Sequence, residues 1–118
     1  MTTPTTIQPS LLPAPILGFL AAHTARVADT AVAAFTPDAV VTDEGRTFRG
    51  TEQILGFLRH SGTEFDYTTE LTGAQRVDDG HWVAVNRLEG NFPGGVVDLA
   101  YRFTMDGELV AELDIAPV

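Results

Sequence analysis

The sequence of 118 residues contains no cysteine and no lysine. Without cysteine the chain can form neither a disulfide nor a thiolate nucleophile, and a reducing compartment suits it, so we expect a cytoplasmic protein. All seven basic residues are arginines, which excludes Schiff-base chemistry and a lysine general base. The side chains left for catalysis are those of aspartate, glutamate, histidine, tyrosine and arginine.

Positive charge is scarce, and the formal net charge is -9. Such a chain repels phosphate backbones and anionic lipid headgroups, so we expect no nucleic-acid partner and no membrane-surface role. No uninterrupted apolar run approaches the roughly 20 residues that a membrane span needs. A neutral or cationic small molecule is the expected partner.

Serine and histidine carry weak signals. The only serines, Ser10 and Ser61, do not lie in a nucleophile-elbow context. The histidines lie at two predicted helix ends and a hairpin, without the close spacing that a metal site requires: His23, His60 and His81. We therefore expect no metal and no cofactor.

The composition divides the chain into a tail and one domain. Residues 1–12 are rich in threonine and proline and have no basic region or long apolar core, so they predict a disordered tail rather than a signal peptide. Residues 13–118 form the expected single domain. Apolar spacing predicts helices over 13–26, over 29–35 and over 51–60, with short strands over 39–43 and 47–49.

The second half has the alternation of strands. We expect strands over 64–75, 81–89, 96–105 and 108–115, separated by turns rich in glycine and aspartate. One face of the last two strands is apolar and is expected to carry Leu99, Tyr101, Phe103, Met105, Leu109, Ala111, Leu113 and Ile115. Helices first and an antiparallel sheet afterwards indicate an α+β domain with its helices on one sheet face.

Two segments carry a resemblance to a known family: DAVVTDEGRTFRGTEQI at Asp38 to Ile54, and RLEGNFPGGVVDLAYRFTMDGELVAELDI at Arg87 to Ile115. The chain resembles the nuclear transport factor 2-like superfamily, and within it the SnoaL-like small proteins, in element order over about 13–115. The resemblance implies a cone-shaped, curved, mostly antiparallel sheet wrapped by three helices of the first half, as in a cystatin-like roll, around an apolar pocket.

The same resemblance implies a homodimer through the outer sheet face, where we expect Trp82, Ala84 and Leu88 to form an apolar patch. It does not imply one activity, because isomerases, cyclases, hydrolases, dehydratases and non-catalytic binding domains share this fold.

Asp43 is the first candidate for catalysis, because it sits where ketosteroid isomerases carry their general base. Burial in an apolar cone would raise its pKa and let it take a proton from a carbon next to a carbonyl. Tyr101 is the only evident donor for the resulting oxyanion. The alternative is that Asp43 caps the turn beside Gly45 and Tyr101 is a core aromatic. The expected ligand is an apolar small molecule, and the expected lining is Phe19, Phe57, Leu58, Phe103 and Met105.

A second hypothesis rests on Arg87, Glu89 and Asp114, which resemble the arginine and the two acids of limonene epoxide hydrolases. Two carboxylates bridged by arginine can hold a water, one acting as base while the other, protonated, acts as acid. A cross-strand ion pair on the outer sheet face explains the same residues. The third hypothesis is a non-catalytic ligand-binding or dimer module, which nothing in the sequence excludes.

Overall fold

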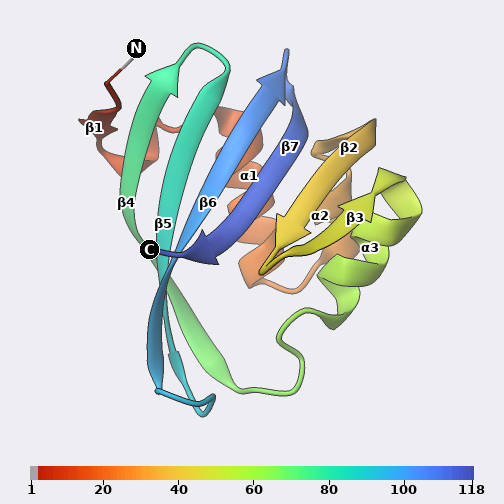
Figure 1. Cartoon of the computed structure of the whole chain (residues 1–118), viewed down its shortest axis with the longest axis vertical. Helices are drawn as coiled ribbons and strands as arrows, with labels where there is room; N and C mark the ends of the chain where they lie inside the picture. Colours follow the sequence, from red (N-terminus) through yellow and green to blue (C-terminus); the bar gives the residue numbers. More distant parts are fainter. Residues whose placement is uncertain (1–2) are drawn as a thin grey trace.

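In the computed structural model, which describes residues 3–118, α helices cover one face of a single curled sheet (Figure 1). The helices are the 3-10 turn η1 (Pro9–Leu11), α1 (Ala14–Thr24), α2 (Ala28–Val32) and α3 (Gly50–His60). The strands are β1 (Thr5–Ile7), β2 (Phe35–Asp43), β3 (Arg46–Arg49), β4 (Tyr67–Asp78), β5 (His81–Gly90), β6 (Val96–Asp106) and β7 (Leu109–Pro117).

The seven strands lie in the order β1-β4-β5-β6-β7-β2-β3. Every neighbouring pair is antiparallel except β2 and β7, which run parallel. Register shifts bend β2, β4 and the β6–β7 pair, as bulges do when a sheet curls. The predicted α+β cone, mostly antiparallel and wrapped by three helices, is confirmed.

Local sequence explains α3 and the turn between β2 and β3. In α3 the residues at helical spacing, Ile54, Phe57 and Leu58, are buried. The side chain of Gln53 accepts a hydrogen bond of 2.8 Å from the backbone N–H of Arg49 and so satisfies a donor at the start of this helix. Glu44 and Gly45 both have positive φ angles, as a two-residue hairpin turn between β2 and β3 requires.

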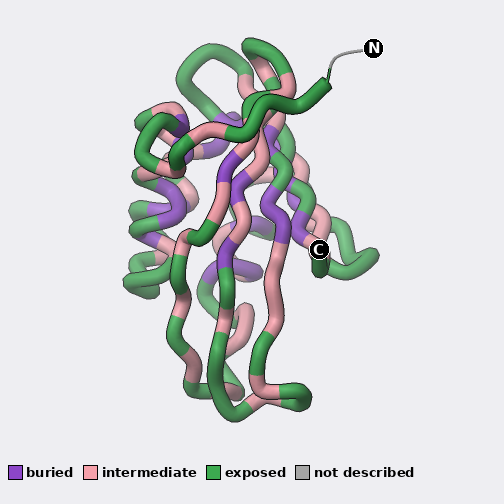
Figure 2. The backbone as a smooth tube through the Cα atoms, turned by 90° about the vertical axis from the view of Figure 1, so that its left-hand side faces the viewer, coloured by how far each residue is buried: buried purple, intermediate pink, exposed green. Residues whose placement is uncertain are grey.

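The core lies between the helices and the inner face of the sheet, where Figure 2 shows the buried segments of both layers facing each other. Its fully buried members include Phe19, Ile54, Val41, Phe103 and Leu113. The lower ends of β4, β5 and β6 extend beyond the helices (Figure 1). The inner face of the sheet is therefore uncovered by helices at that end.

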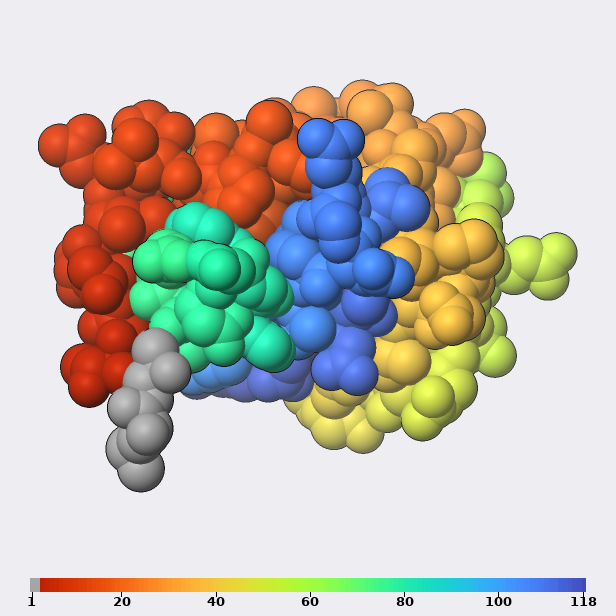
Figure 3. All heavy atoms as spheres, turned by 90° about the horizontal axis from the view of Figure 1, so that it is seen from above, coloured from red at the N-terminus to blue at the C-terminus, as the bar shows by residue number. Residues whose placement is uncertain are grey.

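The first residues do not form the expected disordered tail. Thr5–Ile7 pairs with β4, with Ile7 opposite Ala74, and Leu12 is only 3% exposed. The physical reason is that the apolar side chains of Ile7 and Leu12 pack against the core. Figure 3 shows this segment beside the β4–β5 turn at the upper end of the molecule. Residues 1 and 2 of the expected tail lie outside the described residues.

The expected outer patch of Trp82, Ala84 and Leu88 is wrong. Ala84 is buried opposite Tyr101, Trp82 packs against the core opposite Phe103, and Leu88 lines a cavity. Strand alternation correctly predicted that the three residues share a face, but this face is the inner one and not the outer one.

No helix among the described residues is long and apolar enough to cross a membrane.

The start of β7 also differs from the expected alternation. Met105 pairs with Val110 while Thr104 pairs with Glu112, so Ala111 is an extra residue in β7. This irregularity turns Val110 into the core and leaves Leu109 39% exposed. From Leu113 onward the expected inward face is correct.

Candidate functional site

A cavity with two adjoining chambers lies at the end of the molecule where the sheet extends beyond the helices. We call the first the Asp43 chamber; it has a volume of about 470 Å³ and includes residues of the loop after α3 and of the β5–β6 turn. The second, the Arg26 chamber, has a volume of about 700 Å³. Both chambers share His23, Phe65, Tyr67, Leu88 and Tyr101.

Asp43 ends β2 opposite Ile115 of β7 and lines the chamber that bears its name. Its side chain is half-buried, and the loss of hydration raises the pKa of its carboxyl. The neighbouring charge of Glu44 raises this pKa further, whereas Arg46 lowers it. No hydrogen bond to this carboxylate occurs among the described residues, which speaks against the turn-capping interpretation.

Tyr101 projects from the middle of β6 and is 4% exposed. Burial raises the pKa of its hydroxyl to about 12, and the charge of Asp43 adds to the rise. The side-chain amide of Asn86, itself buried on β5, lies near the hydroxyl and opposes that rise in pKa. Tyr101 therefore remains protonated at neutral pH and can donate a hydrogen bond to a ligand oxygen.

His23, from the last turn of α1, lines both chambers. Its ring stacks on Phe19 at 5.6 Å and meets the Tyr101 ring at 6.5 Å. Burial and the nearby charge of Arg26 lower its pKa to about 4, so the imidazole is neutral at pH 7. A neutral imidazole offers the cavity one donor and one acceptor.

Of the five residues expected to line the pocket, Phe57 lies on the wall of the Asp43 chamber. Phe19, Leu58 and Phe103 are instead fully packed in the core, and Met105 packs against it. Apolar periodicity identifies residues on the inner face but does not separate a cavity wall from the core beneath the helices. The apolar wall is made by residues nearer the lower end of the sheet, including Leu88, Leu99 and Ile115.

The structure does not bring together Arg87, Glu89 and Asp114. All three are exposed, and their register places them on the outer face of the sheet. Arg87 instead binds Asp98 of β6 with two hydrogen bonds, of 2.9 and 3.1 Å. The structural alternative for Arg87, a cross-strand ion pair on the outer face, is therefore present. The partner of Arg87 in this pair is Asp98 and not Glu89.

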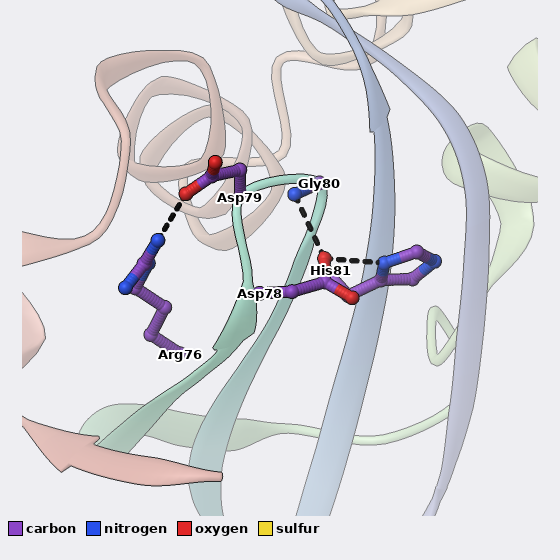
Figure 4. Close-up of polar contacts among 5 residues, drawn as sticks. All are labelled: Arg76, Asp78, Asp79, Gly80 and His81. Carbon is purple, nitrogen blue, oxygen red and sulfur yellow. Dashed lines mark hydrogen bonds and ion pairs between the residues drawn. The ribbon is translucent and has the colours of Figure 1, made fainter. Parts of the chain in front are cut away.

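A second cluster of charged residues lies at the β4–β5 turn, away from the cavity (Figure 4). Asp78 accepts a hydrogen bond of 2.9 Å from the N–H of Gly80 and pairs with the His81 ring at 2.7 Å, while Arg76 pairs with Asp79. These are contacts within one hairpin and serve to fix its turn. Among residues 3–118 no cluster of three metal-ligating side chains occurs.

Sequence reasoning missed two polar residues of the cavity, Arg26 and Tyr67, and also Asn86, which is buried near Tyr101. Tyr67 and Asn86 read as ordinary members of strands, and Arg26 as the end of a helix. Only the meeting of the end of α1 with the start of β4 in space brings Arg26 and Tyr67 together. For Asn86 a usable signal existed, since an amide on the apolar face of a strand needs a buried partner.

A curled sheet over three helices, with an acid and a tyrosine facing one internal cavity, defines a class of small α+β cone domains. Within that class the particular family is shown by sequence: the model of the SnoaL-like domain matches residues 16–113, and the chain belongs to this family. The predicted membership is confirmed.

Solved structures agree with this assignment. A candidate polyketide cyclase from Sinorhizobium meliloti is 30% identical, with a TM-score of 0.84 over 93% of this chain and 100% of its own. A protein with a ketosteroid isomerase-like fold from Catenulispora acidiphila, solved in complex with trimethylamine, is 22% identical, with a TM-score of 0.76 over 88% of this chain and 85% of its own. TerC, co-crystallised with polyporic acid, is 17% identical, with a TM-score of 0.74 over 88% of each chain. The last two support the fold alone. No curated protein matches the sequence.

Proposed function

We propose that the protein is an enzyme that transfers a proton on a small carbonyl compound, as an isomerase or a cyclase does, with Asp43 as the base. The observation that carries the proposal is that Asp43, with a raised pKa, and the protonated Tyr101 line the same chamber. A base of raised pKa next to a hydroxyl donor suits the removal of a proton from a carbon beside a carbonyl.

In this mechanism the Asp43 carboxylate takes a proton from the carbon next to the carbonyl. The electron pair of that C–H bond moves toward the carbonyl oxygen and forms an enolate, to which Tyr101 donates a hydrogen bond. In an isomerisation Asp43 then returns the proton at a second carbon. In a cyclisation the enolate carbon attacks a carbonyl carbon of the same molecule, the C=O π electrons move to that oxygen, and the resulting alkoxide takes the proton from Asp43. The apolar body of the ligand contacts Leu99 and Ile115.

The comparisons support the choice of reaction class without fixing it. The Sinorhizobium meliloti relative is described as a candidate polyketide cyclase. Two neighbours of the same fold were crystallised with small organic molecules, trimethylamine and polyporic acid. We therefore expect the ligand to be a small organic molecule.

The test is deuterium incorporation, in D2O, into small ketones, together with conjugation of the β,γ-unsaturated ketone cyclohex-3-enone followed by absorbance. We expect the protein to accelerate one of these reactions over buffer and Asp43→Asn to lose at least about 100-fold of the acceleration. Asp38→Asn is the matched control, because Asp38 is an exposed aspartate of the same strand.

No acceleration by the wild type, or equal acceleration by Asp43→Asn, would contradict the proposal. Ligand binding by both proteins without any exchange would instead indicate a non-catalytic binding module.

We also propose a homodimer through the outer face of the sheet, on residues other than those expected from the sequence. Gly73, Val85, Ala100 and Ala116 lie opposite one another on β4, β5, β6 and β7 and form a row of small apolar residues. Small side chains allow two sheets to approach closely.

A cytoplasmic location stays a prediction of the sequence.

A further inference from the structure

Tyr67, the first residue of β4, is held in a position for which two glycines make room. A Cβ on Gly62 would stand 2.7 Å from the Tyr67 hydroxyl oxygen, and a Cβ on Gly90 would overlap the Asp66 carbonyl oxygen and stand 2.5 Å from the Tyr67 Cβ. Neither approach is open to a residue with a side chain. The chain is thus shaped around this tyrosine, whose ring lines both chambers of the cavity.

Arg26 reaches the same hydroxyl from the end of α1. The helix ends in a Schellman motif, in which the N–H of Val27 binds the carbonyl of Ala22 and the N–H of Arg26 binds that of His23. Arg26 occupies the position of this motif that glycine usually takes, with a φ of 64°. The left-handed conformation is unfavourable for arginine. Strained backbone of this kind is concentrated at functional sites, and the side chain of Arg26 lines the cavity.

Among residues 3–118, the guanidinium of Arg26 is hydrogen-bonded only to neutral oxygens. It donates to the backbone carbonyls of Ser61 (2.5 Å) and Gly62 (3.3 Å) and to the hydroxyl of Tyr67 (2.7 Å). The ion pairs of residues 3–118 leave Arg26 without a carboxylate partner, although Asp66 lines the same chamber. Arg59, the other arginine of that chamber, is paired with Asp29 at 3.1 Å.

This arrangement polarises the Tyr67 hydroxyl. Its oxygen accepts a hydrogen bond from a cation, and a hydroxyl that accepts such a bond donates its own proton more strongly. The hydrogen bonds of the described chain include no acceptor for that proton. The Tyr67 O–H is therefore available to a ligand, with a positive charge directly behind it.

We propose that Tyr67, backed by Arg26, is an oxyanion-binding site of this cavity, and that the ligand belongs to the class of enols, phenols and enolisable carbonyl compounds. The site rests on the proposed function in one respect, since it would receive the negative oxygen that forms when Asp43 removes a proton. Tyr67 touches the ligand oxygen, and Arg26 acts through Tyr67 as a positioning residue. Tyr101 and Tyr67 then approach the ligand from β6 and β4.

The test uses 4-nitrophenol, whose ionised form absorbs visible light and whose neutral form does not. A protein with a net charge of -9 disfavours bound anions in general, so preferential binding of the ionised form requires a specific site. We expect the wild type to bind the ionised form preferentially. The ratio of ionised to neutral bound probe should fall at least about tenfold in Tyr67→Phe and in Arg26→Gln.

Arg102→Gln is the control for the loss of one positive charge, because Arg102 lies on the outer face opposite Asp114 and should leave the ratio unchanged. Arg26→Lys, which keeps the charge, should restore part of the ratio. A ratio in Tyr67→Phe within about twofold of wild type, or no preference of the wild type for the ionised form, would overturn the proposal. Because the probe loses its proton to solvent, the result does not depend on Asp43, so this site and the proton-transfer function can fail separately.

Discussion

At the scale of single residues, Asp43 and Asp78 show how surroundings decide what a carboxylate does. Asp43 has lost hydration and accepts no hydrogen bond among the described residues, and its pKa is raised. Asp78, at the β4–β5 turn, is bound by His81 and by the N–H of Gly80, and its pKa is lowered. The first arrangement disfavours the charge in the folded state, and the second favours it.

The same substitution should therefore have opposite effects at the two sites. Because the pKa of Asp43 is raised in the folded state, the folded protein holds this proton more tightly than the unfolded chain does. Stability therefore falls as pH rises from 3.8, the ordinary value, through the raised pKa of the folded state. At pH 7 we expect Asp43→Asn to be at least as stable as wild type. Asp78 stabilises the fold above pH 3.8 and loses this effect as pH falls through its lowered pKa, so Asp78→Asn should be less stable than wild type at pH 7, and the difference should shrink in acid.

Urea unfolding at pH 7 and at pH 3 measures both differences, and carboxyl carbon NMR reports the pKa of each residue. If Asp43→Asn were clearly less stable at pH 7, with a depressed pKa in the wild type, Asp43 would be a structural residue and not a base.

At the scale of elements, the start of β4 and the β5–β6 hairpin are joined by contacts that leave no room for a side chain. The N–H of Asn91 binds the carbonyl of Asp66, and the side chain of Asn91 accepts from the N–H of Asp66. Gly90 lies at this crossing. The position of Tyr67 in the cavity depends on it.

Gly90→Ala is expected to destabilise the protein by about 2 kcal/mol or more, because backbone atoms must move to admit the methyl group. Gly56→Ala is the matched control: this glycine lies inside α3, a Cβ there would meet nothing within 4 Å, and alanine should stabilise the helix by up to about 1 kcal/mol. Thermal and urea unfolding of the two variants should give changes of opposite sign. Equal changes would show that the crossing at Gly90 can relax.

At the scale of the whole molecule, the two faces of the sheet have different roles. The inner face carries the core and the cavity. The outer face carries the Arg87–Asp98 pair beside the row of small residues that includes Val85 and Ala100. The proposed dimer would cover this row.

Light scattering at micromolar concentration should give the mass of two chains for the wild type. Val85→Glu, which puts a charge at the centre of the row, should give the mass of one chain while keeping the folded spectrum. Leu11→Glu is the control, since Leu11 is an exposed apolar residue of η1, outside the row. A wild type of single-chain mass throughout the range would refute the dimer.

The sequence by itself determined the types of most elements, the family and the position of Asp43 at the end of a strand. These follow from local properties: apolar periodicity, turn residues and a motif that spans neighbouring elements. The N-terminal strand escaped prediction because Thr5–Ile7, although β-branched throughout, is only three residues long and is ordered by pairing with β4. An extra residue in β7 likewise reversed the side on which Leu109 lies.

Tertiary structure alone decided which face of each strand is the inner one, and so which residues form the cavity. Alternation shows that Trp82, Ala84 and Leu88 share a face, but only packing against the helices shows that this face is internal. The contact between Arg26 and Tyr67 joins residues 41 positions apart. It exists because a helix end, two glycines and the start of a strand meet in space, and no local pattern of the sequence encodes that meeting.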